Sequence, residues 1–310
     1  MTAAAGLEPQ ALSIEALASG SAAIEKALRG LERAAGSDVP VLIVGEAGTG
    51  RSTLARALHL ASQRTHGPFV EVDPAVVPST LFESELFGYA AGAFTGADRA
   101  MKGKVARAEA GTLVLDHVEE IPMATQPKLL RLLAESRFAP LGAPEVEVDV
   151  RFLAIGAPDL SERIRRELFR ADLFYRLEVL SFLIPPLRER QTEVPSLVAH
   201  LLRDLGSRFG RSDLAVTEAA ADWMAEYDWP GNLRELRNVL ERELVVSDDD
   251  VLDPPPPVHG GQKPETLREL EKEHIRRTLA YTRGHQGEAA RLLGISRKSL
   301  WEKRRRFDLP

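Results

Sequence analysis

The sequence predicts an α/β fold in which a mostly parallel sheet is covered by helices on both faces, followed by a helical subdomain and a small all-α domain. Short apolar runs alternate with segments of helical composition from residue 39 to about residue 160, and this alternation is typical of parallel sheets. A glycine-rich phosphate-binding pattern directly follows the first apolar run. Residues 195–246 lose the strand pattern and have helical composition throughout.

Five segments follow one another along the chain. Four consecutive prolines and a Gly pair come after Asp253, which is typical of a linker. The predicted strands cover residues 39–44, 69–72, 111–115 and 150–155. The predicted segments are a flexible N-terminus at 1–12, an α/β nucleotide-binding subdomain at 13–190 that opens with an amphipathic helical stretch at 13–36, a helical subdomain at 191–246, a Pro/Gly-rich linker at 247–264 and a small helical domain at 265–310.

The composition excludes several classes of protein. Of the 310 residues, 44% are hydrophobic and 28% are charged, which is ordinary for a water-soluble globular protein. The absence of cysteine excludes disulfides and thiolate metal sites and fits a reducing cytosol, so we expect a cytoplasmic protein. The N-terminus lacks a signal-peptide pattern, and no apolar run is long enough to span a bilayer, so we expect no membrane partner.

Residues 45–52 carry a phosphate-binding loop with one unusual residue. They match the pattern G-x-x-x-x-G-K-[ST] except that Arg51 stands in place of Lys. An apolar run precedes the loop and a helical segment follows it, whereas the alternative is a plain glycine-rich turn. We expect ATP to bind here, with the Ser52 hydroxyl directed at Mg²⁺. The residues expected to bind the nucleotide are Gly45, Glu46, Ala47, Gly48, Thr49, Gly50, Arg51, Ser52 and Thr53.

Arginine is not equivalent to lysine in this loop. Its guanidinium is planar and longer, and it stays charged, whereas lysine delivers a compact ammonium to the outer phosphates. We therefore expect phosphate attraction to survive and the positioning of the transferred phosphoryl group to suffer.

A second nucleotide motif ends the strand predicted at 111–115. Asp116 follows this strand and is expected to hold Mg²⁺ through water. The next residue, His117, stands where an acid normally orients the attacking water. An imidazole can accept a proton from water, but it titrates near neutral pH and has a single acceptor. A non-catalytic replacement is an equally weighted interpretation of His117.

Residues 81–97 read Leu-Phe-Glu-Ser-Glu-Leu-Phe-Gly-Tyr-Ala-Ala-Gly-Ala-Phe-Thr-Gly-Ala. This string resembles the signature loop of the sigma-54-dependent enhancer-binding proteins of the AAA+ superfamily. The resemblance implies that the tip of the loop contacts sigma-54 RNA polymerase holoenzyme and remodels the closed promoter complex during ATP hydrolysis. The tip residues are Gly92, Ala93, Phe94, Thr95, Gly96 and Ala97. Without the resemblance, a surface turn would be the simpler interpretation.

Further matches to the same family extend over nearly the whole chain. Residues 169–176 resemble the segment whose arginines reach the γ-phosphate of a neighbouring subunit, and Arg170 and Arg176 fit those positions. The family implies a homo-oligomeric ring of six or seven subunits. Residues 229–237 resemble the sensor II motif of the helical lid, in which Arg234 would face the nucleotide. We expect Asn232 to cap the helix that follows.

The C-terminal segment is basic, whereas the rest of the chain is acidic. Residues 264–310 hold 12 Lys/Arg and 7 Asp/Glu, against 28 and 39 in residues 1–263. The segment resembles a helix-turn-helix of the factor-for-inversion-stimulation type, with helices at 286–293 and 296–306. We expect it to bind double-stranded DNA, although a solvated charged face is the alternative. Ser296 would cap the second helix, Arg297, Lys298 and Ser299 would meet base edges, and Lys303, Arg304, Arg305 and Arg306 would meet phosphates.

The departures from the family pattern cluster at the hydrolysis site. Arg51 and His117 are two of them, and Asp73 stands where the family usually has Asn. Residues 154–158 correspond to the sensor I segment but carry no polar side chain at the sensing positions. Together these changes predict altered or lost ATP turnover. We also expect Asp73 to orient His117, so that a carboxylate–imidazole pair positions water.

Three functions are consistent with the sequence. The first is a ring that hydrolyses ATP to remodel sigma-54 holoenzyme, and the second is a pseudo-ATPase regulator that binds ATP and DNA without turnover. The third, a simple DNA-binding repressor, leaves the loop at 92–97 without a purpose. About 35 residues precede the nucleotide-binding region. We therefore expect no attached sensory domain and predict control by a partner protein, by expression level or by nucleotide occupancy.

Overall fold

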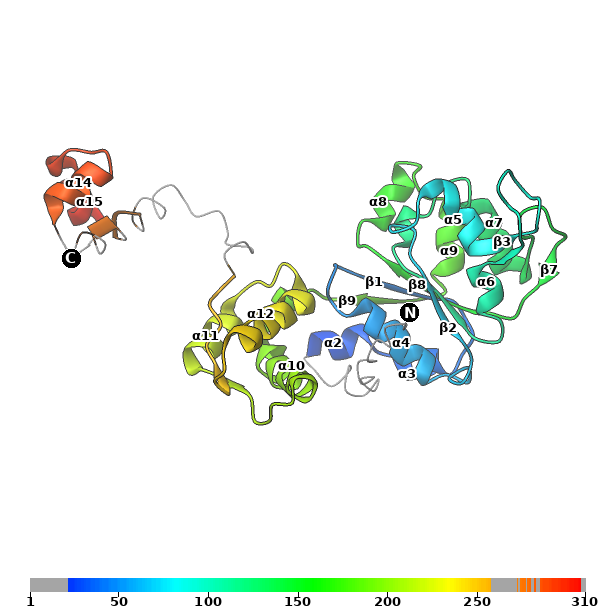
Figure 1. Ribbon diagram of the computed structural model, residues 1–310, viewed down its shortest axis with the longest axis horizontal. Coiled ribbons are helices and arrows are strands. Elements are labelled where there is room, and N and C mark those ends of the chain that lie inside the picture. Colours follow the sequence, from blue (N-terminus) through cyan, green and yellow to red (C-terminus); the bar gives the residue numbers. More distant parts are fainter. Residues whose placement is uncertain are drawn as a thin grey trace. The chain divides into compact units, whose positions relative to one another are not determined.

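The structure, a computed structural model, describes residues 22–257 and 285–307, together with residues 272, 274–276, 278, 279 and 282. The chain divides into two compact units, Met1–Val258 and His259–Pro310, and each is described by itself (Figure 1). The predicted flexible N-terminus at 1–12 and the first part of the amphipathic segment lie outside the described residues.

The first unit is built around a five-stranded sheet in which all neighbouring strands are parallel. The strand order is β2-β5-β8-β1-β9, with β1 in contact with β8 on one side and β9 on the other. Four of the strands lie within two residues of their predicted bounds, whereas β9 was not predicted. The bounds are Val41–Gly45 for β1, Phe69–Val72 for β2, Thr112–Leu115 for β5, Arg151–Gly156 for β8 and Leu180–Ile184 for β9.

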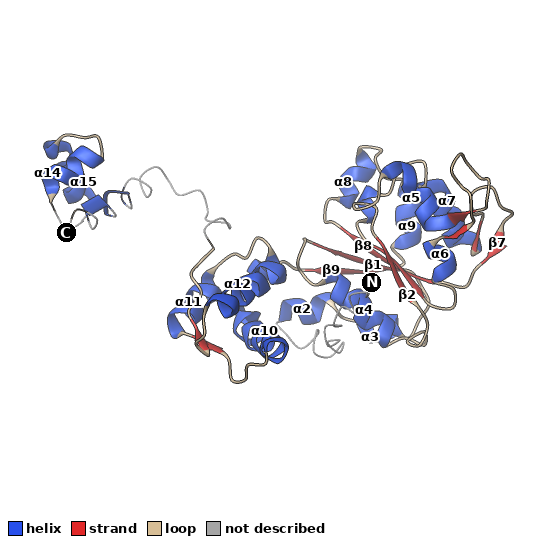
Figure 2. Cartoon of the chain, viewed as in Figure 1, coloured by secondary structure: helices blue, strands red, loops and turns tan. Residues whose placement is uncertain are grey.

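Helices cover both faces of this sheet (Figures 1 and 2). Side chains alternate along β1, so Val41 and Ile43 enter one core while Leu42 enters the other. This arrangement confirms the predicted α/β class. On one face lie α2 (Ala22–Ala27), α3 (Leu31–Ala35) and α4 (Arg51–Leu60). On the other lie α5 (Ser79–Phe87), α6 (Lys104–Arg107), α7 (Gln126–Glu135), α8 (Leu160–Arg165) and α9 (Ala171–Leu177).

The parallel direction of the strands brings their carboxyl ends to one edge of the sheet, where ligands of open α/β folds bind. The phosphate loop follows β1, Asp73 follows β2, Asp116 follows β5, and Ala157 follows β8. Residues far apart in the sequence therefore meet at this edge.

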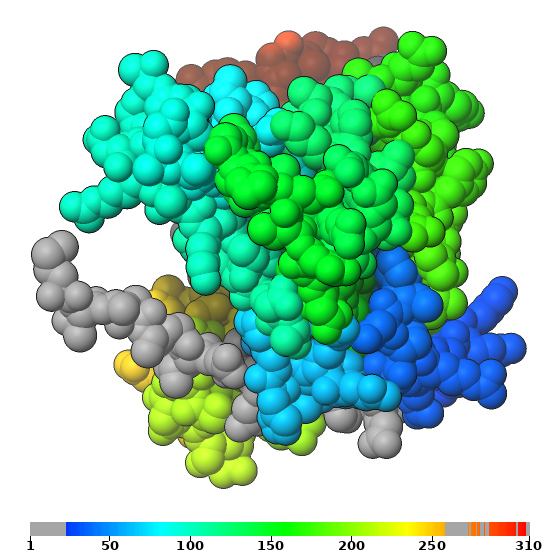
Figure 3. Space-filling view, turned by 90° about the vertical axis from the view of Figure 1, so that its right-hand side faces the viewer, coloured from blue at the N-terminus to red at the C-terminus, as the bar shows by residue number. Residues whose placement is uncertain are grey.

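Two short antiparallel hairpins interrupt the α/β pattern and were not predicted. The first pairs β3 (Gly88–Tyr89) with β4 (Met101–Lys102), and the second pairs β6 (Arg137–Phe138) with β7 (Val146–Glu147). Both lie on the right-hand side of Figure 1, the side that faces the viewer in Figure 3.

A helical subdomain completes the first unit. It contains α10 (Val194–Phe209), α11 (Glu218–Glu226) and α12 (Asn232–Val246), packed around the fully buried Trp229. A small parallel pair joins β10 (Ala215–Val216) to β11 (Val251–Leu252). Leu252 is fully buried in this core, and the Pro254 carbonyl accepts a hydrogen bond from the Trp223 indole. The packed chain thus continues into the region that the sequence predicted as a linker.

The second unit contains α14 (Gln286–Leu292) and α15 (Arg297–Phe307), joined by a turn at Gly294, which has a φ of +68°. Ala290, Leu300 and Phe307 are buried in its small core. The Ser296 hydroxyl accepts a hydrogen bond from Ser299 N at 3.0 Å, so the predicted cap of the second helix is present. Among the described residues, no helix is long and apolar enough to cross a bilayer.

Candidate nucleotide, polymerase and DNA sites

The phosphate loop lies between the end of β1 and the start of α4, as its sequence pattern predicts. Gly48 and Gly50 have φ angles of +79° and +103°, which other residues rarely adopt. The Thr49 hydroxyl donates to the Glu46 carbonyl at 2.8 Å and closes the turn. The ten-residue helix α4 then presents its positive end to this loop, with Ser52 exposed in its first turn. The backbone is therefore suited to hold an anion.

The Arg51 side chain turns inward, toward the sheet. Its Nη1 donates to the Gly45 carbonyl at 2.9 Å and to the Gly156 carbonyl at 2.8 Å, which joins the ends of the neighbouring strands β1 and β8. Only 8% of the residue is exposed. Within the described ranges, no carboxylate oxygen lies within 4.0 Å of its nitrogens, so its charge is held by carbonyl dipoles alone. The guanidinium thus lies at the base of the loop without an ion pair among the described residues.

The helical subdomain binds the carbonyl side of the phosphate loop. Asn232 Nδ2 donates to the Ala47 carbonyl at 3.0 Å, and Leu233 N donates to the Gly48 carbonyl at 2.9 Å. Arg190 Nη2 donates to the next carbonyl, that of Thr49, at 3.1 Å. Three successive carbonyls of the loop are thus satisfied, two by the start of α12 and one by Arg190, which precedes the helical subdomain.

Asn232 does not cap α12, contrary to the expectation from sequence. It adopts a φ of +52°, and its Oδ1 accepts from Leu187 N at 2.7 Å while its amide binds the phosphate loop. The residue before it, Gly231, donates its N–H to Glu235 Oε2 at 2.8 Å instead. Asn232 therefore joins the two subdomains.

Arg234, predicted from sequence to face the nucleotide, has its Cβ close to Gly48 of the phosphate loop. A Cβ built on Gly48 would come within 3.1 Å of the Arg234 Cβ and 2.3 Å of the Gly231 carbonyl. Glu46 is bound by Arg188, whose two terminal nitrogens lie 2.8 and 2.6 Å from the carboxylate. The Arg188 guanidinium lowers the pKa of Glu46, with a smaller contribution from Asn232.

Asp73, Asp116 and His117 meet at the ends of the adjacent strands β2 and β5. His117 Nδ1 lies 3.1 Å from Asp73 Oδ1 and 3.6 Å from Asp116 Oδ1, and one ligand atom from each residue fits within 4.8 Å of the others. His117 has a φ of +45°, and its N–H donates to Asp116 Oδ1 at 2.9 Å. The structure therefore brings together the residues predicted as a carboxylate–imidazole pair, next to the acid predicted to hold Mg²⁺.

Glu119 is a site residue that sequence reasoning missed. It lies in the short 3₁₀ turn η1 (Val118–Glu120), is only 6% exposed, and its Oε2 accepts from Ala157 N at 3.1 Å. Its carboxylate thus reaches the segment identified from sequence as sensor I, which offers no polar side chain of its own. An acid two residues after His117 was visible in the sequence, but its burial was not.

The two predicted arginine fingers are held by contacts within their own chain. Arg170 precedes α9 and binds Asp172 through two hydrogen bonds of 3.0 and 2.7 Å. Arg176 lies on α9, and its Nε and Nη2 donate to the Leu133 carbonyl at 3.2 and 3.1 Å. Arg170 would have to leave Asp172 to reach a neighbouring subunit.

The signature loop at 92–97 joins β3 to β4. Gly92 N donates to the Ala97 carbonyl at 2.8 Å, which closes the tip, and Phe94 is 44% exposed there. The ring of Phe94 packs edge-on against that of Tyr89, with the ring centroids 4.9 Å apart. The tip therefore presents the exposed Phe94 side chain, whose ring is supported by the Tyr89 ring.

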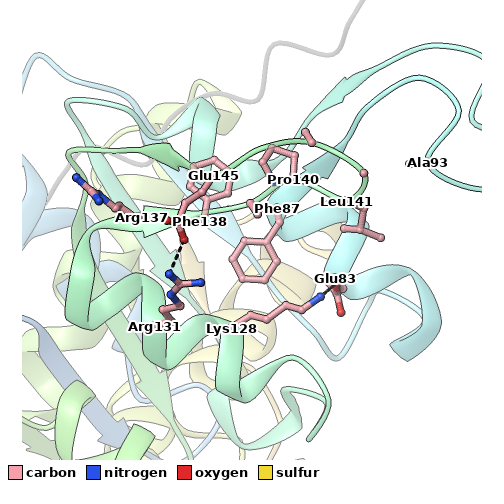
Figure 4. A pocket seen from close by; sticks show the side chains of 13 residues that line it. Glu83, Phe87, Ala93, Lys128, Arg131, Arg137, Phe138, Pro140, Leu141 and Glu145 are labelled. Atoms are coloured by element: carbon pink, nitrogen blue, oxygen red, sulfur yellow. Dashed lines mark hydrogen bonds and ion pairs between the residues drawn. The ribbon is translucent and has the colours of Figure 1, made fainter.

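The second hairpin packs against this loop. Ala90 N donates to the Leu141 carbonyl, and Leu141 N donates to the Gly88 carbonyl, both at 2.9 Å. Between the hairpins, α5 and α7 lies a groove of about 530 Å³, crossed by the ion pairs of Lys128 with Glu83 and of Arg131 with Glu145 (Figure 4). A displacement of either hairpin would therefore shift the other through these backbone hydrogen bonds.

In the second unit, the predicted DNA-contacting residues lie just before α15 and along it. Ser296, Arg297, Lys298, Arg305 and Arg306 are exposed, whereas Ser299, Lys303 and Arg304 are partly buried. Arg297 lies against Gly287 of α14, where an added Cβ would come within 2.4 Å of its Nη2. Trp301, one turn later, is 54% exposed, and the Arg305 guanidinium lies 5.8 Å from its ring centroid. Trp301 was not singled out from the sequence.

The fold and these loops define the protein as an AAA+ domain with a helical lid and a helix-turn-helix. Residues 17–183 match the family described as the Sigma-54 interaction domain, residues 188–256 match the AAA+ ATPase lid domain, and residues 266–307 match the Fis family of bacterial regulatory proteins. The chain therefore belongs to the sigma-54-dependent enhancer-binding proteins, as its sequence motifs predicted.

Similar proteins include several bacterial regulators. The chain is 38% identical to Regulatory protein AtoC of Escherichia coli (strain K12) over 292 residues, which is 88% of this chain and 63% of AtoC. It is 40% identical to the phenol regulator MopR of Acinetobacter guillouiae over 302 residues, covering 90% of this chain and 54% of MopR. The chain thus spans less than two thirds of the length of these two relatives.

Solved structures of NtrX from Brucella abortus are also similar. The complex with ADP gives a TM-score of 0.70 at 31% identity, and the complex with ATP gives 0.69 at 32% identity. Each comparison covers 93% of this chain and 68% of the NtrX chain.

Proposed function

We propose that this protein binds ATP at the phosphate loop and acts as a sigma-54-dependent transcriptional regulator. The loop geometry, the uncompensated charge of Arg51 and the position of Arg234 over Gly48 support nucleotide binding. The similarity to an NtrX structure in complex with ATP points the same way. The Ser52 hydroxyl and the Asp116 carboxylate are oxygen donors of the kind Mg²⁺ prefers, and they would hold it directly or through water.

The observation that carries the proposal is the signature loop, which has the family string intact and exposes Phe94 at its tip. This loop would contact sigma-54 RNA polymerase holoenzyme, while α15 would bind upstream double-stranded DNA. In the motor form of the function, a homo-oligomeric ring would couple ATP hydrolysis to remodelling of the closed promoter complex. Arg170 and Arg176 would then serve the site of a neighbouring subunit.

A hydrolysis-impaired regulator is the second candidate, and Arg51 and His117 favour it. The Arg51 Nη1 is committed to two carbonyls, whereas a P-loop lysine reaches the outer phosphates. His117 stands in the position of the acid that orients water. Such a protein would bind ATP and DNA and modulate sigma-54 transcription without turnover, under the control of a partner protein or of nucleotide occupancy.

The test has three arms on the purified chain. Calorimetric titration with ATP and ADP measures binding, and steady-state ATP turnover at several protein concentrations measures ring-dependent hydrolysis. Open-complex formation on a sigma-54 promoter, with Phe94→Ala as the matched variant, measures remodelling. ATP binding with concentration-dependent turnover and Phe94-dependent remodelling supports the motor.

The remaining outcomes separate the alternatives. ATP binding and sigma-54 contact without turnover support the hydrolysis-impaired regulator. A retained DNA footprint with no sigma-54 contact would leave a DNA-binding repressor. No uptake of ATP by the folded chain would contradict both ATP-dependent candidates.

A further inference from the structure

The peptide unit between Gly156 and Ala157 is held on both sides by buried charged side chains. Its carbonyl, that of Gly156, accepts from Arg51 Nη1 at 2.8 Å, and its N–H, that of Ala157, donates to Glu119 Oε2 at 3.1 Å. Arg51 is 8% exposed and Glu119 is 6% exposed. One peptide at the end of β8 therefore connects a cation of the phosphate loop to an acid that the nucleotide motifs do not include.

The two hydrogen bonds reinforce each other. An amide that donates its N–H to a carboxylate becomes a better acceptor at its carbonyl, because hydrogen bonds in a chain polarise one another. Glu119 therefore strengthens the contact of the Gly156 carbonyl with Arg51. The second bond of Arg51 Nη1, to the Gly45 carbonyl at 2.9 Å, then fixes the guanidinium between two strand ends.

Glu119 is itself held in place from outside. Its main-chain carbonyl accepts from Arg163 Nη1 at 3.1 Å, and the neighbouring Glu120 pairs with Arg163 Nη2 at 2.7 Å. The 3₁₀ turn that carries Glu119 is thus tied to α8, so the carboxylate has a fixed base from which to hold the peptide.

We propose that Glu119 is a positioning residue of the nucleotide site, which acts through the Gly156–Ala157 peptide to hold the Arg51 guanidinium at the phosphate loop. In this role Glu119 does not touch the nucleotide and does not transfer a proton. It supplies, from a neighbouring turn, the polar contact that the sensor I segment lacks. This inference rests on the proposed binding of ATP at the loop.

The test uses substitutions that separate the charge of Glu119 from its hydrogen bond to Ala157 N. Glu119→Gln keeps an acceptor oxygen at the same distance but loses the charge, whereas Glu119→Asp keeps the charge but withdraws it from Ala157 N. Glu119→Met keeps the length and removes the acceptor, and it replaces the Asp variant if that one does not fold. Glu109→Gln is the matched control, because Glu109 is an exposed glutamate before β5 whose Oε2 also accepts from a backbone N–H, that of Asp149, at 3.3 Å.

The readout is the affinity for ATP measured by calorimetry on the full chain. Without the partly buried hydrogen bond from Ala157 N, the Gly156–Ala157 peptide no longer holds Arg51 as firmly, so the Asp or Met variant should bind ATP about ten-fold more weakly. Glu119→Gln and Glu109→Gln should stay within about three-fold of the unsubstituted chain. In an Arg51→Gln background the effect of Glu119→Asp should shrink to about two-fold or less, because Glu119 acts through Arg51.

Several results would overturn the inference. A loss of affinity in Glu119→Gln with none in Glu119→Asp would mean that the charge matters and not the hydrogen bond to Ala157 N. An undiminished effect in the Arg51→Gln background would show that Glu119 does not act through Arg51. ATP turnover lost in Glu119→Gln at unchanged affinity would make Glu119 an acid–base group instead. If the unsubstituted chain bound no ATP, the proposed function would fail first, which is a different outcome from binding that is insensitive to Glu119.

Discussion

His117 Nδ1 lies 3.1 Å from Asp73 Oδ1, and this contact joins the C-terminal ends of the neighbouring strands β5 and β2. Asp73 Oδ1 also accepts a hydrogen bond from Ala75 N at 2.8 Å, which fixes the orientation of the carboxylate independently of His117. A carboxylate that is oriented in this way determines which ring nitrogen faces the site. The pair thus has the geometry needed to position a water molecule.

The first prediction concerns this pair. If His117 positions the attacking water, His117→Ala should lower ATP turnover by about a hundred-fold or more, since acid–base groups contribute about 10²–10⁴. The affinity for ATP should change by less than about three-fold, because the imidazole is not a phosphate ligand. Steady-state turnover and calorimetry measure the two quantities. His66→Ala, an exposed histidine, is the control, and an unchanged turnover in His117→Ala would make the histidine a non-catalytic replacement.

The second prediction concerns Arg51. Its guanidinium is drawn to the carbonyls of Gly45 and Gly156, whereas a lysine ammonium is compact and free to follow the outer phosphates. Arg51→Lys should therefore raise ATP turnover, by about ten-fold if phosphoryl positioning limits the rate. Arg56→Lys on the same helix is the matched control. Turnover that stays at the unsubstituted level in Arg51→Lys would show that another residue limits hydrolysis.

The motifs were predictable from the sequence because they are local strings. The phosphate loop and the signature loop each lie within a few consecutive residues, and the structure gives them the expected turns. The pairing of Asp73 with His117 was predictable only because the resemblance assigned both to one site. The inward direction of Arg51 was not predictable, since it depends on the Gly156 carbonyl, 105 residues away in the sequence.

Two further misses differ in kind. The strand β9 reads Leu-Ser-Phe-Leu-Ile, an apolar run like those of the predicted strands, so its signal was present in the sequence and was overlooked. Asn232 has the residue type of a helix cap, but its amide has partners in Ala47 and Leu187 instead. Tertiary contacts override local preference at Asn232.

The third prediction concerns the arginine fingers. Arg170 is paired with Asp172 within its own chain, and an exposed pair of this kind contributes little to stability. The ion pair between Arg170 and Asp172 can therefore break at little cost when a neighbouring subunit brings a nucleotide close to Arg170. Arg170→Ala should abolish the rise of turnover with protein concentration, a loss of about 10³-fold at saturating protein. The affinity for ATP of the dilute chain should not change.

Arg166→Ala is the control for the third prediction, because Arg166 is an exposed arginine nearby that pairs with Glu162. Turnover is measured over a range of protein concentrations for the three chains. A variant lacking Arg170 that hydrolyses ATP as cooperatively as the unsubstituted chain would exclude Arg170 as a finger.

The fourth prediction concerns pH and the contact between the lid and the phosphate loop. Hydrogen bonds from Arg188 lower the pKa of Glu46 from its ordinary value of 4.5. A carboxyl group with a lowered pKa in the folded state stabilises the fold fully above pH 4.5, and this stabilisation is lost as pH falls through the lowered pKa. The unfolding free energies of the unsubstituted chain and of Glu46→Gln should therefore differ at pH 7 and converge in acid.

The difference at pH 7 should be about 1 kcal/mol or less, because the pair is partly exposed to solvent. Denaturant unfolding at a series of pH values measures it. Glu226→Gln, an exposed acid of the lid at the end of α11, serves as the control. A difference that does not depend on pH would show that the Glu46 charge is not what the lid recognises.

The fifth prediction separates folding from DNA recognition in the second unit. A Cβ at Gly287 would meet Arg297 Nη2 at 2.4 Å and Cζ at 2.9 Å, and both atoms belong to the far end of a flexible side chain. Gly287→Ala should therefore leave the fold intact, or stabilise α14 by up to about 1 kcal/mol, while it pushes Arg297 out of its position. Affinity for DNA selected from a random-sequence library with the unsubstituted chain should fall by about ten-fold, as for the loss of one base contact.

The double variant makes the fifth prediction decisive. If Gly287→Ala acts only by displacing Arg297, it should have no further effect on DNA affinity in an Arg297→Ala background, since the displaced group is already absent. Fluorescence anisotropy with the selected DNA and thermal unfolding of the full chain give the two readouts. An alanine at 287 that weakens DNA binding equally in both backgrounds would mean that α14 itself contacts the DNA, and Arg297 would then lose its assigned role at the base edges.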